Sequence, residues 1–406
     1  MWKVILLCAF VGITAGEFAT YENYTLFHVT PQIDVQIKFL QSYYKFAKPH
    51  AYDLWNVPNR EHACVNIMVH TDFVEDFKMR MTYVNLNFIS LEDYVQTLIN
   101  LTTKKGQSSS FDFTNYHTLE EIYKNLDDLA EMYPENVKII VGGSTYEGRQ
   151  IKGVKISFKP NNPGVFLEGG INAREWMAPA VVMYIIHQLL SSNDTHTRNT
   201  AESYDWYIFP VFNPDGYVYT HTTDRMWTKT RKPYNNTIGS NPNKNWDYKW
   251  NGNIFGSKSN MFAGPEPFSE VETKSMSEYI ESIKDKFFAY FSFHSHSPDL
   301  TYPPDDFTNN TKQYDSDMKS ITKFIFHEYG FKNVFKTIDL DRGSSITYVK
   351  GTYNKPLVLA YGLQDIYSLN GFLQSPKLIV KHSKIALYDL ENILENTKYY
   401  SYDKYY

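Results

Sequence analysis

Apolar and polar residues follow two recurring patterns along this chain. Near-continuous apolar runs occur at residues 164–170, 205–212 and 287–295, and such runs are typical of strands that are buried on both faces of a sheet. Between them lie segments with apolar residues every three or four positions, such as 117–133 and 179–190, and this spacing predicts helices. The alternation predicts an α/β fold, with a mixed central sheet and helices on both faces.

The first hundred residues repeat this pattern on a smaller scale. Residues 24–29 and 63–70 are short apolar runs typical of strands, and apolar residues recur at helical spacing between and after them. Residues 104–110, KKGQSSS, join a dibasic pair to glycine and small polar residues, which is a composition typical of a linker. We therefore expect a small α/β domain over residues 17–105 and a larger domain over residues 106–406.

The amino-terminal residues have the pattern of a secretory signal. Lys3 precedes an apolar run at residues 4–13, and small residues follow at 14–16. This run is shorter than the roughly 18 apolar residues that a membrane-spanning helix needs. We therefore expect a signal peptide over residues 1–16, a secreted extracellular protein and no membrane anchor. Secretion agrees with five asparagines in N-glycosylation triplets, where we expect N-linked glycans: Asn23, Asn100, Asn193, Asn235 and Asn309.

Composition narrows the classes of partner. Hydrophobic residues make up 42% of the chain and charged residues 21%, a balance that supports a packed core. The net charge of −5 shows no sign of the basic surface that nucleic-acid binding requires, so we expect no nucleic-acid partner. Of the two cysteines, Cys8 lies in the predicted signal, which leaves Cys64 without an intrachain disulfide partner. The sequence leaves the oligomeric state open.

Polar residues follow three of the predicted central strands. Glu175 comes after the first apolar run, Asn213–Gly216 after the second, and His294 stands at the end of the third. Ligands gather at the carboxyl ends of strands in sheets of this kind. A glutamate and a distant histidine that meet there would form a plausible zinc site that lacks one protein ligand.

Eight sequence motifs carry a resemblance to a known family. In order along the chain they are YHTLEEIY, STYEGRQIKGVKIS, GGINAREWMAP, FPVFNPDGY, DRMWTKTR, NKNWDYKW, FSFHSHS and GLQD. With these motifs the chain resembles the secreted zinc carboxypeptidases of the A/B type over nearly its whole length after the signal. The resemblance implies that residues 17–105 are an activation segment, or propeptide domain, which covers the mouth of the active site until cleavage at Lys104–Lys105.

The resemblance also implies where a metal would be held. Glu175 and His294 match two of the zinc ligands, but the first histidine of the motif falls on Asn172. A neutral carboxamide has no basic nitrogen lone pair and is a poor zinc ligand. The acidic residue that orients the first histidine in the family falls on Asn241. A ligand and its supporting carboxylate are thus both replaced, and we expect zinc binding to be weak or absent.

The catalytic positions of the family are replaced as well. The general-base position falls on Gly362, the carbonyl-polarising arginine on Thr228, and the capping tyrosine on Asp339, so that no catalytic residue is intact. The positions that bind the substrate are better kept. They are Arg174, Asn243, Lys244 in place of an arginine, and Ile346 at the base of an apolar specificity pocket.

Two functions follow from these residues. The first is a catalytically inactive carboxypeptidase homologue that binds peptide or protein C-termini or other partners. The second is an active zinc metallocarboxypeptidase that removes apolar C-terminal residues through a rearranged site, with His296 or Asp339 as a substitute ligand or base. Loss of a general base costs roughly 10² to 10⁴ in rate, and loss of a charged stabiliser of the transition state about 10² to 10³. The sequence therefore favours the inactive homologue.

Overall fold

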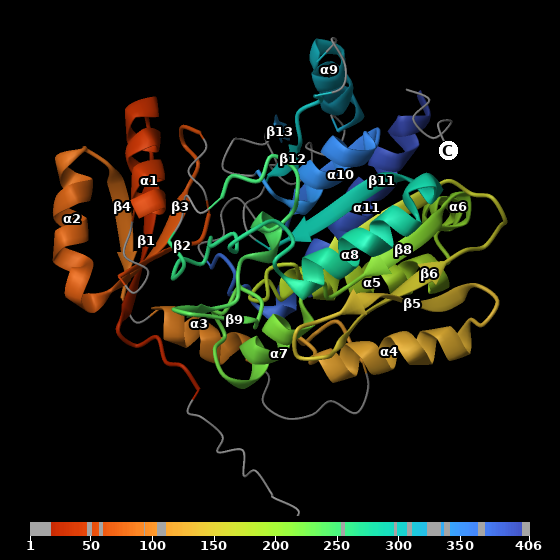
Figure 1. The fold of residues 1–406 in the computed structure, drawn as a ribbon, viewed down its shortest axis with the longest axis horizontal. Helices are drawn as coiled ribbons and strands as arrows, with labels where there is room; N and C mark the ends of the chain where they lie inside the picture. Colours follow the sequence, from red (N-terminus) through yellow and green to blue (C-terminus); the bar gives the residue numbers. More distant parts are fainter. Residues whose placement is uncertain are drawn as a thin grey trace, which may run out of the picture.

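The chain folds into a small N-terminal unit and a larger C-terminal domain (Figure 1). The computed structural model describes residues 18–46, 51–56, 60–92, 94–103, 111–252, 256–295, 299–306, 311–322, 334–336, 342–363 and 370–399. Five of the expectations from the sequence fall outside these residues, one of them the glycan expected on Asn309. The other four concern the signal peptide, the cleavage site at Lys104–Lys105, and the roles of His296 and Asp339.

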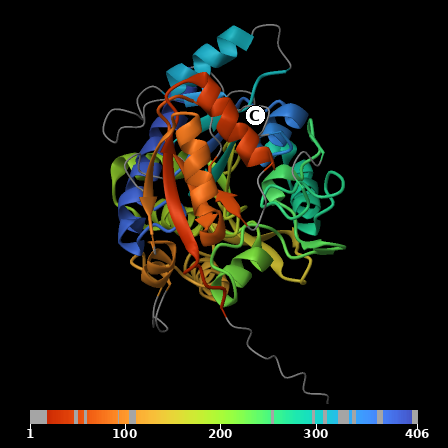
Figure 2. The same ribbon diagram turned by 90° about the vertical axis from the view of Figure 1, so that its left-hand side faces the viewer.

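The N-terminal unit is a four-stranded antiparallel sheet with strand order β2-β3-β1-β4. Its strands are β1 (Tyr24–Thr30), β2 (Tyr52–Leu54), β3 (Val65–His70) and β4 (Asn87–Leu91), and its helices are α1 (Asp34–Phe46), α2 (Val74–Tyr83) and α3 (Tyr94–Thr102). Figure 2 views this unit face on, with α1 and α2 in front of the strands. The sequence indicated β1, β3 and the three helices, whereas no pattern pointed to the short edge strands β2 and β4.

Alternation along the strands explains why this unit has two apolar faces. Phe27 and Val29 of β1 pack with Leu40 of α1 and Phe77 of α2. Leu26, the neighbour of Phe27, points to the opposite face, where it joins a cluster that includes side chains of the C-terminal domain. Successive residues of a strand point to opposite faces, so one face of this sheet is covered by α1 and α2 and the other by α3 and the larger domain.

The C-terminal domain is built on an eight-stranded sheet with order β13-β12-β14-β11-β7-β8-β6-β5. The pairs β7/β8, β7/β11, β11/β14 and β12/β13 are parallel, and the others are antiparallel. The predicted mixed sheet is therefore confirmed. The strands are β5 (Val137–Ser144), β6 (Gln150–Ile156), β7 (Gly164–Gly169), β8 (Asp205–Phe209), β11 (Phe287–His294), β12 (Leu300–Tyr302), β13 (Val334–Lys336) and β14 (Leu357–Gly362); β9 (Pro233–Tyr234) and β10 (Thr237–Ile238) form a separate hairpin.

Helices cover both faces of this sheet, as the sequence predicted. One apolar cluster joins alternate strand residues to α4, α5 and α11, and a second joins the intervening residues to α8 and α10. The helices are α4 (Leu119–Met132), α5 (Met177–Ser191), α6 (Thr195–Ser203), α7 (Pro214–Thr222), α8 (Val271–Ser282), α9 (Thr311–Ile321), α10 (Ser345–Tyr353) and α11 (Ile379–Tyr399). No helix in the described part of the chain is long and apolar enough to cross a membrane.

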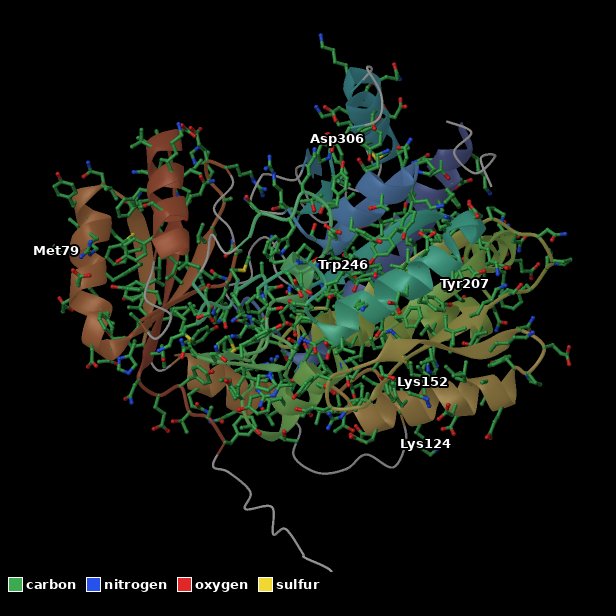
Figure 3. The ribbon with its side chains drawn as sticks, viewed as in Figure 1. Met79, Lys124, Lys152, Tyr207, Trp246 and Asp306 are labelled. Atoms are coloured by element: carbon green, nitrogen blue, oxygen red, sulfur yellow. The ribbon has the colours of Figure 1, made fainter. Side chains whose placement is uncertain are left out.

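Aromatic residues fill the centre of the domain. Trp246 lies near the middle of the molecule (Figure 3) and is completely buried. Its ring packs at 5.9 Å from that of Phe212 and at 5.2 Å from that of Tyr348. Trp176 is also buried, against Tyr116. These contacts give the two tryptophans a packing role.

The carboxyl ends of three neighbouring strands create the place for a site. β7 ends at Gly169, and Gly170 then adopts a φ of +64° in which a Cβ would lie 3.0 Å from the ring of Pro179. This glycine lets the chain turn sharply from the strand towards α5. β11 ends at His294 and β14 ends at Gly362, and these two residues are partners in the parallel register.

Candidate active site

Three positions that the resemblance assigns to zinc ligands lie together and are buried. The Oε2 atom of Glu175 is 3.0 Å from Nδ1 of His294 and accepts a 2.9 Å hydrogen bond from the backbone N–H of Ser295. The other carboxylate oxygen, Oε1, accepts a 2.8 Å bond from Nδ2 of Asn172. The turn before α5 and the end of β11 thus bring together residues that are 119 positions apart, as the sequence predicted.

A second buried carboxylate, that of Glu168, is linked to His294 through a serine hydroxyl. Nε2 of His294 is 3.0 Å from the hydroxyl of Ser292, which donates a 2.6 Å bond to Oε1 of Glu168. The hydroxyls of Ser345 and Tyr290 donate to the same oxygen, at 3.1 and 3.3 Å. Burial raises the pKa of Glu168, while the His294 charge and the hydroxyl donors oppose that rise. Sequence reasoning missed this residue, although an acid inside the apolar run GVFLEGG was a usable signal.

The donor atoms here do not match the three-ligand set of a catalytic zinc site. They are one carboxylate, one imidazole and one carboxamide, and the amide turns its N–H to Glu175. Oδ1 of Asn172 is buried without a hydrogen-bond partner. Among the described residues, no group of three or more His, Cys, Asp or Glu side chains is placed to hold a metal ion.

Asn241 does not support Asn172 through any bond in the described structure. Its Oδ1 accepts a 2.9 Å bond from the backbone N–H of Asn243, and its Nδ2 donates to the carbonyl of Asn260 at 3.1 Å. The side chain therefore caps the short helix η2 (Pro242–Lys244). It stabilises its own loop, a role that its position in the motif did not indicate.

Gly362 and Thr228 occupy the positions of the family's general base and carbonyl-polarising arginine. Gly362 lies beside His294, and its backbone N–H donates to the carbonyl of Asp299 at 3.0 Å. Thr228 is buried, and its carbonyl accepts a 3.2 Å bond from the N–H of Ala173. Backbone hydrogen bonds thus hold both residues near the metal-ligand positions, but neither carries a side chain that ionises.

Two arginines, Arg174 and Arg225, lie at the edge of the site. The guanidinium of Arg174 lies 4.1 Å from the ring centroid of Phe372. Arg225 is fully buried against Trp176, 3.7 Å away, and donates to the carbonyls of Arg174 and Phe372 at 2.8 and 3.2 Å. Burial lowers the pKa of Arg225 to about 10, so it remains a cation at neutral pH. These bonds make Arg225 a support for the backbone beneath Arg174.

The N-terminal unit contacts this edge of the site through Asp53 and Trp55. Oδ2 of Asp53, in β2, forms a 2.6 Å ion pair with Arg174, and Oδ1 accepts a 3.0 Å bond from Nδ2 of Asn260. Trp55 packs on Phe372 with ring centroids 5.5 Å apart. No pattern in the sequence pointed to Asp53, because its partner lies in the other domain.

The remaining predicted binding residues lie on η2 and α10. Oδ1 of Asn243 accepts a 3.1 Å bond from the backbone N–H of Ser345, which joins the two elements. Ile346 is buried in a cluster with Trp246, and Lys244 is buried as well. The assignment of Asn243, Lys244 and Ile346 to ligand binding stays a prediction.

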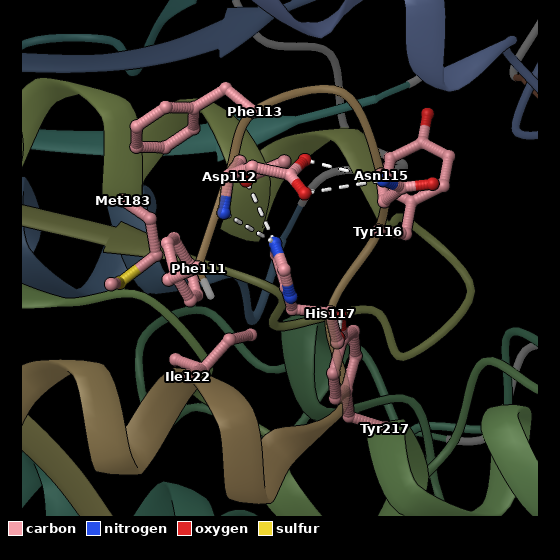
Figure 4. Close-up of a pocket in the computed structure, with 10 residues that line it drawn as sticks. Phe111, Asp112, Phe113, Asn115, Tyr116, His117, Ile122, Met183 and Tyr217 are labelled. Carbon is pink, nitrogen blue, oxygen red and sulfur yellow. Dashed lines mark hydrogen bonds between the residues drawn. The ribbon is translucent and has the colours of Figure 1, made fainter. Parts of the chain in front are cut away.

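A small cavity of about 10 Å³ lies apart from these residues, where the C-terminal domain begins (Figure 4). His117 points at the backbone of Asp112, with Nε2 2.7 Å from the carbonyl oxygen, and its ring stacks on Phe111 at 4.0 Å. The cavity has room for about one water molecule. It offers no space for a peptide.

The fold and the position of its site define an α/β domain of the metallopeptidase class, with a second, smaller domain held against that site. The sequence model of the family described as zinc carboxypeptidase matches residues 122–388, and that of the carboxypeptidase activation peptide matches residues 27–102. The chain therefore belongs to the zinc carboxypeptidase family.

Relatives with this family name cover most of the chain. It is 35% identical over 408 residues to zinc carboxypeptidase A 1 of Anopheles gambiae, an alignment that covers 97% of this chain and 94% of the relative. It is 38% identical over 298 residues to a zinc carboxypeptidase of Simulium vittatum, covering 71% and 98%. The crystal structure of carboxypeptidase A from Helicoverpa armigera is similar in fold, with a TM-score of 0.79, 22% identity, and 93% and 98% of the two chains covered.

Proposed function

We propose that this chain is a secreted carboxypeptidase A-like protein that does not hydrolyse peptides and that binds peptide or protein C-termini. The observation that carries the proposal is Gly362, which stands beside His294 in the register of β14 and β11. The family's motif places its general base here, and glycine has no group that can take a proton from water. Loss of a general base lowers the rate by roughly 10² to 10⁴.

Two more replacements act in the same direction. Thr228 offers at most a neutral hydrogen bond where the motif has a charged arginine, and a charged donor bonds more strongly. Asn172 supplies an amide where the motif has a histidine, so zinc binding is weak or absent. Zinc in this family activates water and polarises the carbonyl, and weak binding would remove both contributions. The separate losses do not add, but each lowers the rate.

The cations that would bind a carboxylate are better preserved. Arg174 matches its position in the motif, and Lys244 replaces an arginine, which keeps the positive charge but loses the two-pronged fit of arginine. Oδ1 of Asn243 is held by the backbone N–H of Ser345, so a ligand would meet the amide N–H donors. Positive charge and N–H donors suit a terminal carboxylate.

Secretion and N-glycosylation belong to the same proposal. All four of the glycosylation triplets whose asparagine is described have that residue exposed: Asn23, Asn100, Asn193 and Asn235. Exposure is what an attached glycan requires. Asn309, the fifth, lies outside the described residues.

The competing function is an active zinc carboxypeptidase with a rearranged site. It is favoured by the names of the relatives, which at 35% identity are zinc carboxypeptidases. The residues that would substitute, His296 and Asp339, lie outside the described residues.

A single sample distinguishes the two functions. The secreted protein is treated with trypsin, dialysed against a weak chelator and analysed for zinc, and then incubated with peptides ending in Phe or Leu, with and without added zinc. We expect well under one zinc per chain and no release of the C-terminal residue. Turnover that a strong chelator stops would refute the proposal. An active zinc carboxypeptidase processed in parallel shows that the dialysis and the assay preserve activity.

A further inference from the structure

The residues at the metal-ligand positions form one continuous chain of hydrogen bonds. It runs from Asn172 through Glu175 and His294 to Ser292 and ends on Glu168. Each step is between 2.6 and 3.0 Å. The chain therefore links the turn before α5 to the end of β11 and then to β7.

This chain satisfies a carboxylate that would otherwise be costly to bury. Glu175 is only 1% exposed, and a buried carboxylate without partners destabilises a fold strongly. Oε1 receives the N–H of Asn172, and Oε2 receives the backbone N–H of Ser295 and lies against His294. These protein groups compensate the charge of the carboxylate without calling on a cation.

The orientation of Asn172 is informative about how this charge is balanced. An amide can turn either its oxygen or its N–H groups to a neighbour. Asn172 turns Nδ2 to Glu175 at 2.8 Å, and its Oδ1 is buried without a hydrogen-bond partner. The amide N–H of Asn172 therefore forms a charge-assisted hydrogen bond with the carboxylate of Glu175.

We infer that these residues act as a metal-independent clasp, defined as Asn172, Glu175, His294, Ser292 and Glu168, and that the domain reaches its full stability without a bound metal ion. The inference goes beyond the proposed function, because a protein without hydrolytic activity could still need zinc to fold. It rests on the contacts within the clasp and on the chemistry of Asn172, whose amide has no basic nitrogen lone pair to offer a metal ion. It assigns the preserved Glu175 and His294 a structural role in this chain.

The test measures the thermal unfolding midpoint Tm of the full secreted chain after chelation and after addition of excess zinc. We expect the wild-type Tm to be the same in both. Asn172→Ala removes the donor to Glu175 and should lower Tm by several degrees in both conditions. Asn199→Ala, at an exposed position of α6, is the matched control and should not lower Tm.

A second variant gives the clasp the three ligands of a zinc site. Asn172→His completes a His, Glu and His set, so its Tm should rise with zinc and fall with chelator, because a ligand that binds only the folded state stabilises it. If Asn172→Ala does not fold, Ser292→Ala breaks the link between His294 and Glu168 and should lower Tm independently of zinc.

Two results would overturn the clasp: a wild-type Tm that falls on chelation and recovers with zinc, or clasp variants that unfold at the wild-type temperature. Peptide turnover measured on the same samples separates this inference from the proposed function. If the protein hydrolyses peptides and its Tm does not depend on zinc, only the proposed function is refuted. If its Tm depends on zinc and it does not hydrolyse peptides, only the clasp is refuted.

Discussion

Asp53 and Arg174 form a 2.6 Å ion pair that joins the activation-peptide unit to the carboxypeptidase domain. Both side chains are largely buried, with 11% and 6% exposure. Arg174 is also one of the residues that we propose for binding a peptide carboxylate. On that proposal, Asp53 pairs with the guanidinium that a ligand's carboxylate would use, and the two carboxylates should compete for it.

We predict that Asp53→Asn raises the affinity of the uncut protein for peptides that end in a free carboxylate. The amide keeps the shape of the aspartate but loses its charge, so Arg174 becomes available. We expect Kd to fall by roughly tenfold or more, which is about 1.4 kcal/mol. Titration with a fluorescent peptide measures it. Asp72→Asn, an exposed acid of the same unit, is the control, and equal affinities in wild type and Asp53→Asn would contradict the competition.

The pair also shows where sequence reasoning stops. Residues within one motif could be placed from the sequence, because GGINAREWMAP and FSFHSHS each lie at the end of a buried strand whose position is set by the sheet. The meeting of Glu175 and His294 followed from that rule. The partner of Asp53 could not be predicted, because it depends on how two separately patterned domains pack together.

Glu168 marks a second limit of the same kind. Its position within β7 could be read from the sequence, but its donors come from β11 and α10. A strand pattern shows which residues are buried without showing which neighbouring element supplies their partners. Asn241 is a third case, since its motif position suggested a link to the metal corner, whereas its side chain caps η2.

Lys244 leads to a prediction about ligand binding. Lys244→Ala should weaken binding of free-acid peptides by roughly tenfold, because a charge-assisted hydrogen bond is lost. Lys244→Arg should bind at least as tightly as wild type, since its planar fork fits a carboxylate. Lys249→Ala, a partly exposed lysine paired with Asp306, is the control. The same peptides with an amidated C-terminus should bind weakly to every variant, and tight binding of the amides would contradict carboxylate recognition.

Asp389 makes stability depend on pH. It is buried in α11, where it accepts a hydrogen bond from Tyr361 of β14, and burial raises its pKa to about 8. An unfolded aspartate has a pKa of about 3.9, so between these values the folded state binds more protons. The free energy of unfolding should therefore fall as pH rises from about 4 to about 8.

Asp389→Asn removes this titration while keeping an acceptor for Tyr361. We predict that its Tm exceeds the wild-type Tm at pH 8, and that the difference shrinks as pH falls towards 4. Glu272, whose pKa burial raises to about 7, changes stability in the same direction, so only the difference between variant and wild type isolates Asp389. Asp128→Asn on the exposed side of α4 is the control. A difference in Tm that does not vary with pH would contradict the raised pKa.

Restoring the family's catalytic residues is the strongest test of the replaced positions. Asn172→His completes the metal ligands, Gly362→Glu places a general base beside His294, and Thr228→Arg supplies the charged group. We predict that the triple variant, after trypsin treatment and with zinc, releases C-terminal Phe or Leu. Gly362→Glu alone should remain inactive, because a base without a zinc-bound water has no activated nucleophile to deprotonate. The effects should be strongly non-additive, with turnover only when ligand and base are present together. A folded triple variant that binds zinc but shows no turnover would mean that the positions assigned to base and arginine are wrong.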